Sequence, residues 1–216
     1  MGKKILTKRQ LVVLEAVGSE PKLSGFYLSG GTALAAFYLQ HRLSDDLDFF
    51  TAEVVDIHTV GSFTESLKKK LNADKVIFEK LYDRRLFTFK WKSEELKLEF
   101  TTYPFVQFER PKPTNSKVKT DSFRDISANK LMALLDRFEP KDFVDLFFIL
   151  KKCKLPELVK DTEKKFGVTI DPLFLGGELA KVTRIESLPH MLKSLTVSEL
   201  KSFFTKKALE LKPQIF

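Results

Sequence analysis

Asp46 and Asp48, which are separated by a single residue, are the side chains of this chain best suited to bind a metal ion. In an extended strand, residues i and i+2 project from the same face, so both carboxylates are expected to enter one small volume. Upstream, the turn Ser29-Gly30-Gly31-Thr32 can bring backbone N–H groups beside that volume. Mg²⁺ prefers carboxylate oxygens together with waters and phosphate oxygens. The two segments therefore indicate a site for a metal-bound triphosphate.

The glycine turn allows two interpretations. Glycine pairs between a strand and a helix often serve turn geometry alone, because glycine tolerates a positive φ. Ahead of an aspartate pair, we favour phosphate binding by Gly30 and Gly31. The hydroxyl groups of Ser29 and Thr32 could add contacts to a triphosphate, and Thr32 could also cap the following helix.

A third carboxylate is expected at Glu99. In the segment LKLEFTTYP, apolar and polar residues alternate, and Glu99 falls on the polar face of a strand that should neighbour the aspartate strand. There it could hold a metal ion or accept the proton of an incoming hydroxyl. Equal weight goes to the alternative, in which Glu99 is a surface residue paired across the sheet with Lys90 or Lys97.

A second group of charged residues lies between residues 127 and 150. Lys130 and Arg137 are seven residues apart, which on one helix returns to nearly the same face about 10.5 Å along the axis. Such a face could reach the β- and γ-phosphates of a nucleotide. Asp142 and Asp145 on the next helix could hold these cations in place. The alternative is an ordinary set of salt bridges between two helices.

Two sequence blocks resemble a known family. SGGTAL at residues 29–34 followed by HRLSDDLDFF at residues 41–50, and SANKLMALLDRFEPKDFVDLFFIL at residues 127–150, resemble the minimal nucleotidyltransferases of the AbiEii type. These are relatives of the polymerase-β superfamily and frequent toxins of toxin–antitoxin pairs. The resemblance covers roughly residues 10–150. Glu99 departs from the family's pattern, which often has Asp as the third carboxylate.

The resemblance implies a function. It implies Mg²⁺-dependent transfer of a nucleoside monophosphate from an NTP to a hydroxyl, on an RNA 3′ end such as that of tRNA or on a protein, with an antitoxin protein as a further partner. Lys130 is carried over as the nucleotide-contacting lysine and Asp145 as the family's acid, while Arg42 belongs to the HRxSxDxD pattern. The expected catalytic residues are Asp46, Asp48, Glu99, Lys130 and Asp145, with Asp46, Asp48 and Glu99 as metal ligands. The expected nucleotide-binding residues are Ser29, Gly30, Gly31, Thr32, Arg42, Lys130 and Arg137.

Composition bounds the class of protein. The 216 residues are 43% hydrophobic and 31% charged, as in a globular protein. The net charge of +8 favours a polyanionic partner such as nucleic acid, or else a lysine-rich surface without a partner. The single Cys153 excludes an internal disulfide and indicates a reducing compartment. No apolar run approaches the ~20 residues that cross a bilayer, so a cytoplasmic protein without membrane contact is expected.

The hydrophobic pattern predicts an α/β fold: a small mixed sheet flanked by helices over residues 1–110, then a helical C-terminal lobe over residues 121–216. The resemblance implies that the sheet is of the nucleotidyltransferase type. Residues 104–120 are expected to link the lobes, and the nucleotide is expected in the cleft between them. Strands are predicted at 26–28, 47–51, 75–81, 86–91 and 96–101, with turns at 83–85 and 92–95. Helices are predicted at 7–17, 32–39, 60–71, 127–138, 141–153, 156–166, 173–180, 187–195 and 198–211.

Two other functions stay open. The chain could be a catalytically silent nucleotide- or nucleic-acid-binding protein of the same fold, or a structural partner protein whose acids are surface charges. A metal-dependent phosphohydrolase is disfavoured because no histidine lies near the acids. The spacing of His41, His58 and His190 does not suggest zinc, and no full P-loop sequence occurs.

Overall fold

A computed structural model describes residues 5–211. The chain divides into two units. The first contains the described residues up to Tyr38, together with Ser44–Phe105 and Glu109–Ser122. The second contains Leu39–Leu43, Val106–Phe108 and the described residues from Phe123 onward. Each unit is described by itself.

The first unit is built on a mixed sheet of seven strands in the order β3-β4-β5-β2-β1-β7-β6. Strand β2 pairs antiparallel with β1 and parallel with β5, and β1 pairs parallel with β7. Strands β3, β4 and β5 form an antiparallel meander. The strands are β1 (Tyr27–Ser29), β2 (Leu47–Thr51), β3 (Lys75–Leu81), β4 (Arg84–Lys90), β5 (Glu95–Thr102), β6 (Lys112–Pro113) and β7 (Lys119–Thr120).

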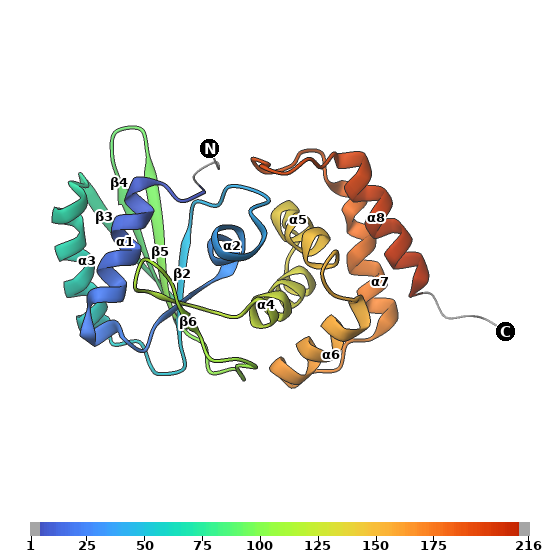
Figure 1. Ribbon diagram of the computed structural model, residues 1–216, viewed down its shortest axis with the longest axis horizontal. Coiled ribbons are helices and arrows are strands. Elements are labelled where there is room, and N and C mark those ends of the chain that lie inside the picture. Colours follow the sequence, from blue (N-terminus) through green and yellow to red (C-terminus); the bar gives the residue numbers. More distant parts are fainter. Residues whose placement is uncertain (1–4, 212–216) are drawn as a thin grey trace. The chain divides into compact units, whose positions relative to one another are not determined.

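The two faces of this sheet differ in chemistry. On one face, Leu28 lies opposite Phe49 and Phe49 opposite Phe100, and all three side chains are fully buried. Helices α1 (Lys8–Ser19) and α3 (Ile57–Leu71) lie on this side of the sheet, while the short α2 (Gly30–Ala33) lies on the other (Figure 1). The second face carries the polar residues of β1, β2 and β5. The alternation of apolar and polar residues thus places the candidate acids away from the core.

Local signals explain the helix ends of the first unit. Thr7 and Gln10 form a capping box at the start of α1, and Asp56 caps α3 by accepting hydrogen bonds from two backbone N–H groups. Asn72 ends α3 in the left-handed conformation. After α2 the backbone widens into a π-helix over Leu34–Leu39, and Gln40 with a φ of 51° ends it.

The second unit is helical. Its helices are α4 (Phe123–Asp136), α5 (Pro140–Ile149), α6 (Leu155–Phe166), α7 (Pro172–Ala180) and α8 (Val197–Glu210), with a 3₁₀ turn at Lys181–Arg184. Proline stands at the first or second position of α5, α6 and α7, where its missing N–H costs nothing. The core of this unit includes Ile126, Leu131, Phe143, Ile149 and Phe204.

The fold class is as predicted, with a mixed sheet, flanking helices and a helical C-terminal part. Three local predictions were wrong. Residues 187–195 form no helix, because Arg42 pairs with Met191 in a β-bridge and backbone N–H groups of Leu192 and Lys193 donate to His41 O. Arg84 and Arg85 belong to β4 rather than to a turn. Residues 112–120 contribute β6 and β7 to the sheet and so are not simply a linker.

Candidate active site

A row of polar residues crosses the second face of the sheet in the first unit. Ser29 of β1 lies opposite Asp48 of β2, and Asp48 lies opposite Glu99 of β5. Residues that share a register position on neighbouring strands project from the same face. Asp121 extends the row, because it follows β7 directly and its carboxylate accepts a hydrogen bond of 3.0 Å from the Ser29 hydroxyl. The predicted adjacency of Asp48 and Glu99 is therefore present in the sheet.

Gly30 forms the corner beside this row. Its φ of +69° lies in the region that glycine adopts without strain. A Cβ placed on Gly30 would fall 2.0 Å from Asp48 Oδ2, so the carboxylate lies directly against the glycine backbone. Glycine is required here by both conformation and space. The glycine turn and the aspartate strand thus meet as the sequence predicts.

Backbone contacts fix the segment that carries Asp46. The Gln10 side chain is buried, and its amide group donates to the backbone oxygens of Ser44 at 2.8 Å and Asp45 at 3.0 Å. The Thr32 hydroxyl donates to the backbone oxygen of Asp46. These contacts position the residues that lead into β2. Thr32 does not cap α2, because the N-cap position belongs to Ser29, which makes no side-chain cap hydrogen bond.

Ser29 and Asp121 are both buried. The Asp121 carboxylate accepts from the Ser29 hydroxyl and from the backbone N–H of Ser122 at 3.2 Å, and the Asp121 backbone oxygen accepts from the Tyr38 hydroxyl at 2.6 Å. A buried carboxylate needs such donors to replace water. Asp121 therefore ties the glycine corner to β7 and to the helical turns after β1.

Arg84 neutralises the outer end of the polar row. Its Nε donates to Glu99 Oε1 at 2.6 Å, and its Nη2 donates to Glu99 Oε2. The hydrogen bonds with Glu99 raise the pKa of the Arg84 guanidinium, and the charge of Asp48 raises it further. The partner of Glu99 is thus neither Lys90 nor Lys97, which lie beside Glu95 instead.

The donor set fits a hard divalent cation in part. Asp48 supplies a carboxylate directly against the Gly30 corner, and Asp46 stands just before β2. Mg²⁺ needs only one or two carboxylates when phosphates and waters complete its shell. Within residues 5–211, no three His, Cys, Asp or Glu side chains come together as a ready metal cage. The carboxylate of Glu99, the expected third ligand, is engaged by Arg84 and by the Thr101 hydroxyl.

The second unit contains a buried cluster of charges around Asp145. Arg42 donates to both Asp145 oxygens, at 2.6 and 2.9 Å, and His41 Nε2 lies 2.7 Å from Oδ1. Lys130 Nζ lies 2.7 Å from Asp145 and 2.9 Å from Asp142. Arg137 Nε donates to Asp142 at 3.0 Å. Asp142 and Asp145 therefore pair with these cations, which fits both the predicted positioning role and the alternative of ordinary salt bridges between two helices.

Burial and charge act against each other in this cluster. Burial alone would raise the pKa of the Asp145 carboxyl, but the charges of Lys130 and Arg42 hold it well below its usual value. Burial alone would likewise lower the pKa of Lys130, but Asp145 and Asp142 keep it above its usual value. For His41, burial prevails and lowers the pKa. Its Nδ1 is buried without a hydrogen-bond partner within the described part of the chain. Burial and the charges of Arg42 and Lys130 thus disfavour protonation of the imidazole, and the Asp145 carboxylate opposes this effect.

The predicted residues thus fall into two sets. The first unit holds Ser29, Gly30, Gly31, Thr32, Asp46, Asp48 and Glu99, and the second holds Arg42, Lys130, Arg137 and Asp145. The sequence pattern does not single out Gln10, Arg84 or Asp121. The predicted strand begins at residue 86, and extending its alternation by two residues toward the N-terminus would include Arg84 in β4. The contacts of Gln10 and Asp121 join residues far apart in the chain, so no local pattern signals them.

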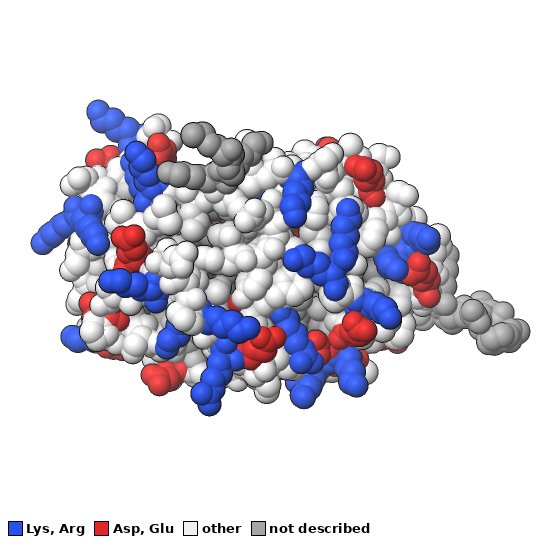
Figure 2. Space-filling view, viewed as in Figure 1, with Lys and Arg blue, Asp and Glu red and all other residues white. Residues whose placement is uncertain are grey.

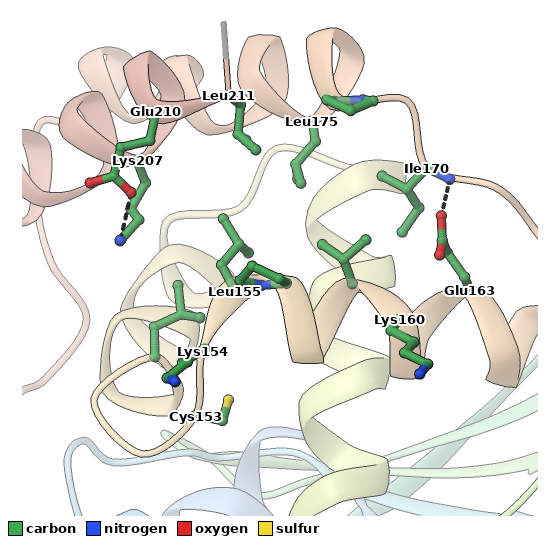
Figure 3. Close-up of a pocket in the computed structure, with 14 residues that line it drawn as sticks. Cys153, Lys154, Leu155, Lys160, Glu163, Ile170, Leu175, Lys207, Glu210 and Leu211 are labelled. Carbon is green, nitrogen blue, oxygen red and sulfur yellow. Dashed lines mark hydrogen bonds and ion pairs between the residues drawn. The ribbon is translucent and has the colours of Figure 1, made fainter.

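A separate pocket lies among α6, α7 and α8 (Figure 3). Its volume is about 630 Å³, and Leu155, Leu175 and Leu211 point into it. None of the predicted site residues lines it.

On the face drawn in Figure 2, Lys and Arg side chains are spread widely rather than confined to one patch. No helix within residues 5–211 combines the length and the apolarity that a bilayer crossing requires.

Comparisons with known proteins show the family of this chain. The family described as "Nucleotidyl transferase AbiEii toxin, Type IV TA system" matches residues 13–210. An uncharacterized protein of Aquifex aeolicus, aq_aa25, is 34% identical over 165 residues, which are 74% of this chain and 76% of that protein.

Two solved structures share the fold. The crystal structure of JHP933 from Helicobacter pylori is 21% identical, with a TM-score of 0.59 over 94% of this chain and 89% of that one. MenT4, a nucleotidyltransferase toxin from Mycobacterium tuberculosis, is 12% identical, with a TM-score of 0.55 over 93% and 82% of the two chains. The predicted resemblance is confirmed, and the chain is a nucleotidyltransferase that belongs to the AbiEii toxin family.

Proposed function

We propose that this protein transfers the nucleoside monophosphate of an NTP to a hydroxyl group, with release of pyrophosphate, in a reaction that needs Mg²⁺. The observation that carries the proposal is the contact between the Asp48 carboxylate and the Gly30 backbone within the polar row of the sheet. A carboxylate that holds a cation and a glycine corner that receives phosphates must lie side by side for this chemistry.

We assign a role to the candidate site residues of the first unit. Asp46 and Asp48 hold the cation, and Gln10 and Thr32 position the backbone that carries Asp46. When bound, Mg²⁺ supplies positive charge to the phosphate oxygens. Gly30 and Gly31 leave room for the triphosphate. The hydroxyl of Ser29 is turned to Asp121, so we assign it the role of fixing the corner.

Glu99 is proposed as the group that accepts the proton of the acceptor hydroxyl or completes the cation's ligands. Either role requires its release from Arg84, which then becomes available to phosphate oxygens on the same face. Arg42, Lys130, Arg137 and Asp145 stay predictions as nucleotide-binding and catalytic residues. The ion pairs of the second unit support a fixed orientation for each of them.

The acceptor is proposed to be an RNA 3′ end, such as that of tRNA, or a protein hydroxyl. The net charge of +8 supports RNA, because lysines release counterions from a phosphate backbone. Exposed cations at Lys69 and Lys70 of α3 and at Lys117 and Lys119 near β7 are available for such contacts. The family is one of toxins, so we also propose that an antitoxin protein opposes this activity.

The test combines labelled NTPs, Mg²⁺, total RNA and a protein extract. The wild type should label one acceptor class, and Asp46→Ala with Asp48→Ala should abolish the label. Asp45→Ala is the matched control, because Asp45 is exposed and adjacent. Equal labelling by wild type and double variant would refute the assigned site. Tight NTP·Mg²⁺ binding by calorimetry without transfer to any acceptor would favour a silent binding protein instead.

A further inference from the structure

Strand β3 is an edge of the sheet, because it ends the strand order and pairs only with β4 among the named strands. Six of its seven residues are exposed, and the seventh, Val76, is half-buried. Ile77, Phe78 and Leu81 are between 36% and 47% exposed. An exposed apolar edge strand presents unpaired backbone N–H and C=O groups and is a template for pairing with another strand.

The charges of β3 and of Asp74, which precedes it, make no ion pair among the described residues. Asp74, Lys75, Glu79 and Lys80 are exposed, and none of the four makes an ion pair within residues 5–211. Across β4, moreover, Lys75 lies opposite Lys90 and Lys80 opposite Arg85. Like charges directly opposite each other in a sheet are unfavourable. Acidic residues on a strand added at the unpaired edge of β3 would therefore stabilise the charges of these two lysines.

The sequence of β3 supplies such neighbours when it pairs with itself. In an antiparallel ladder, hydrogen-bonded and non-hydrogen-bonded residue pairs alternate. A two-fold axis must exchange each pair with a pair of the same kind. When two copies of one strand pair, the axis therefore passes between two copies of the same residue. With Ile77 on the axis, Lys75 lies opposite the second copy's Glu79, and Asp74 lies opposite its Lys80. Symmetry repeats both pairs. Val76 then lies opposite the second copy's Phe78, which closes an apolar centre.

The neighbouring registers lose this match. With Val76 on the axis, Lys75 lies opposite Ile77 and Asp74 opposite Phe78. With Phe78 on the axis, Glu79 lies opposite Ile77 and Lys80 opposite Val76. Each of these arrangements sets a charge against an apolar side chain. One register alone among the three joins opposite charges at four positions.

We propose that two copies of this protein associate through antiparallel pairing of their β3 strands about Ile77, which makes one continuous sheet. The proposal is independent of the proposed function. It predicts a concentration-dependent dimer of the full chain in sedimentation or light-scattering measurements.

Charge exchange tests the register. Lys75→Glu sets two Glu–Glu pairs across the axis, and Glu79→Lys sets two Lys–Lys pairs, so each should weaken dimerisation by about tenfold or more. The double variant Lys75→Glu with Glu79→Lys restores opposite charges and should restore the dimer. Circular dichroism of each variant confirms folding. A monomer at all concentrations, or a dimer that is unaffected by the single variants, overturns the proposal.

Cross-linking gives a second test. In a Cys153→Ser background, Ile77→Cys places two thiols at the axis, and mild oxidation should yield a disulfide-linked dimer. Val54→Cys is the matched control, because Val54 is 84% exposed and lies outside the strands. Equal cross-linking of the two variants would indicate random collision and overturn the assigned interface.

Discussion

The Asp48 carboxylate touches the backbone of Gly30, at a place where a Cβ would fall 2.0 Å from Asp48 Oδ2. Gly30→Ala should therefore push the carboxylate away and also strain a backbone with a φ of +69°. We expect a loss of at least about 2 kcal/mol in the free energy of unfolding, together with loss of nucleotidyl transfer.

Gly61→Ala is the control for Gly30→Ala. Gly61 lies in α3, and a Cβ there would meet nothing within 4 Å. Alanine favours a helix over glycine, so this change should raise the free energy of unfolding by about 0.5–1 kcal/mol. Thermal unfolding and a transfer assay measure both effects. Full activity in Gly30→Ala would contradict the role of the corner.

Arg84 should compete with a cation for the charge of Glu99 and Asp48. Arg84→Gln removes that positive charge from the polar row, so Mn²⁺ used as a probe should bind about tenfold more tightly. Calorimetry or electron paramagnetic resonance measures the affinity without any turnover. Arg85→Gln is the control, because the neighbouring Arg85 donates to the backbone oxygens of Tyr82 and Arg84 instead. Weaker Mn²⁺ binding in Arg84→Gln would show that Arg84 helps to build the site.

His41 should make stability depend on pH. Burial lowers its folded pKa below the usual 6.5, so the unfolded chain binds the proton more readily. The free energy of unfolding should therefore fall as the pH drops below 6.5. His41→Gln should flatten this slope by up to about 1.4 kcal/mol per pH unit. The exposed His58, changed to Gln, is the control.

Asp145 should govern a second acid transition in the same titration. Its folded pKa lies well below 3.8, so its contribution to stability is present above that pH and is lost as the pH falls further. This loss should occur in the wild type and in His41→Gln alike. Denaturant unfolding at a series of pH values separates the two transitions. A parallel pH profile for both proteins above pH 5 would contradict the assignment to His41.

Lys130 should be required for the stability of the fold, whether or not it also takes part in catalysis. Lys130→Met would leave Asp142 and Asp145 short of a buried positive charge. Removing one partner of a buried pair typically costs about 3–5 kcal/mol. Lys160→Met, on the exposed side of α6, should change the free energy of unfolding by less than about 0.5 kcal/mol. Chemical denaturation compares the two variants, and equal stability would show that the pair contributes little.

The alternation of apolar and polar residues along each strand predicted the parts of the site that depend on short segments. Strand β2 spans the predicted residues 47–51, and the polar face of β5 brings Glu99 beside Asp48. Arg84 was missed because charged residues after Asp83 resemble a turn, although the backbone there is already extended. Asp121 was missed because its partner Ser29 lies 92 residues earlier, and a single sequence contains no signal of that pairing.

The second unit shows the same limit. The apolar spacing of residues 187–195 fits a helix, but their backbone groups bond to residues 41–43 instead. Helix propensity is weak, so such tertiary pairing overrides it. The charge cluster followed the prediction better, because Lys130, Asp142 and Asp145 lie on consecutive helices joined by a short turn.

Strand β1 lies between β2 and β7, and β7 is complete only at Thr120. A ribosome must therefore release more than half of the chain before β1 gains its second neighbour. We expect nascent chains shorter than this to lack the support that β7 gives to the glycine corner, and therefore to lack transfer activity.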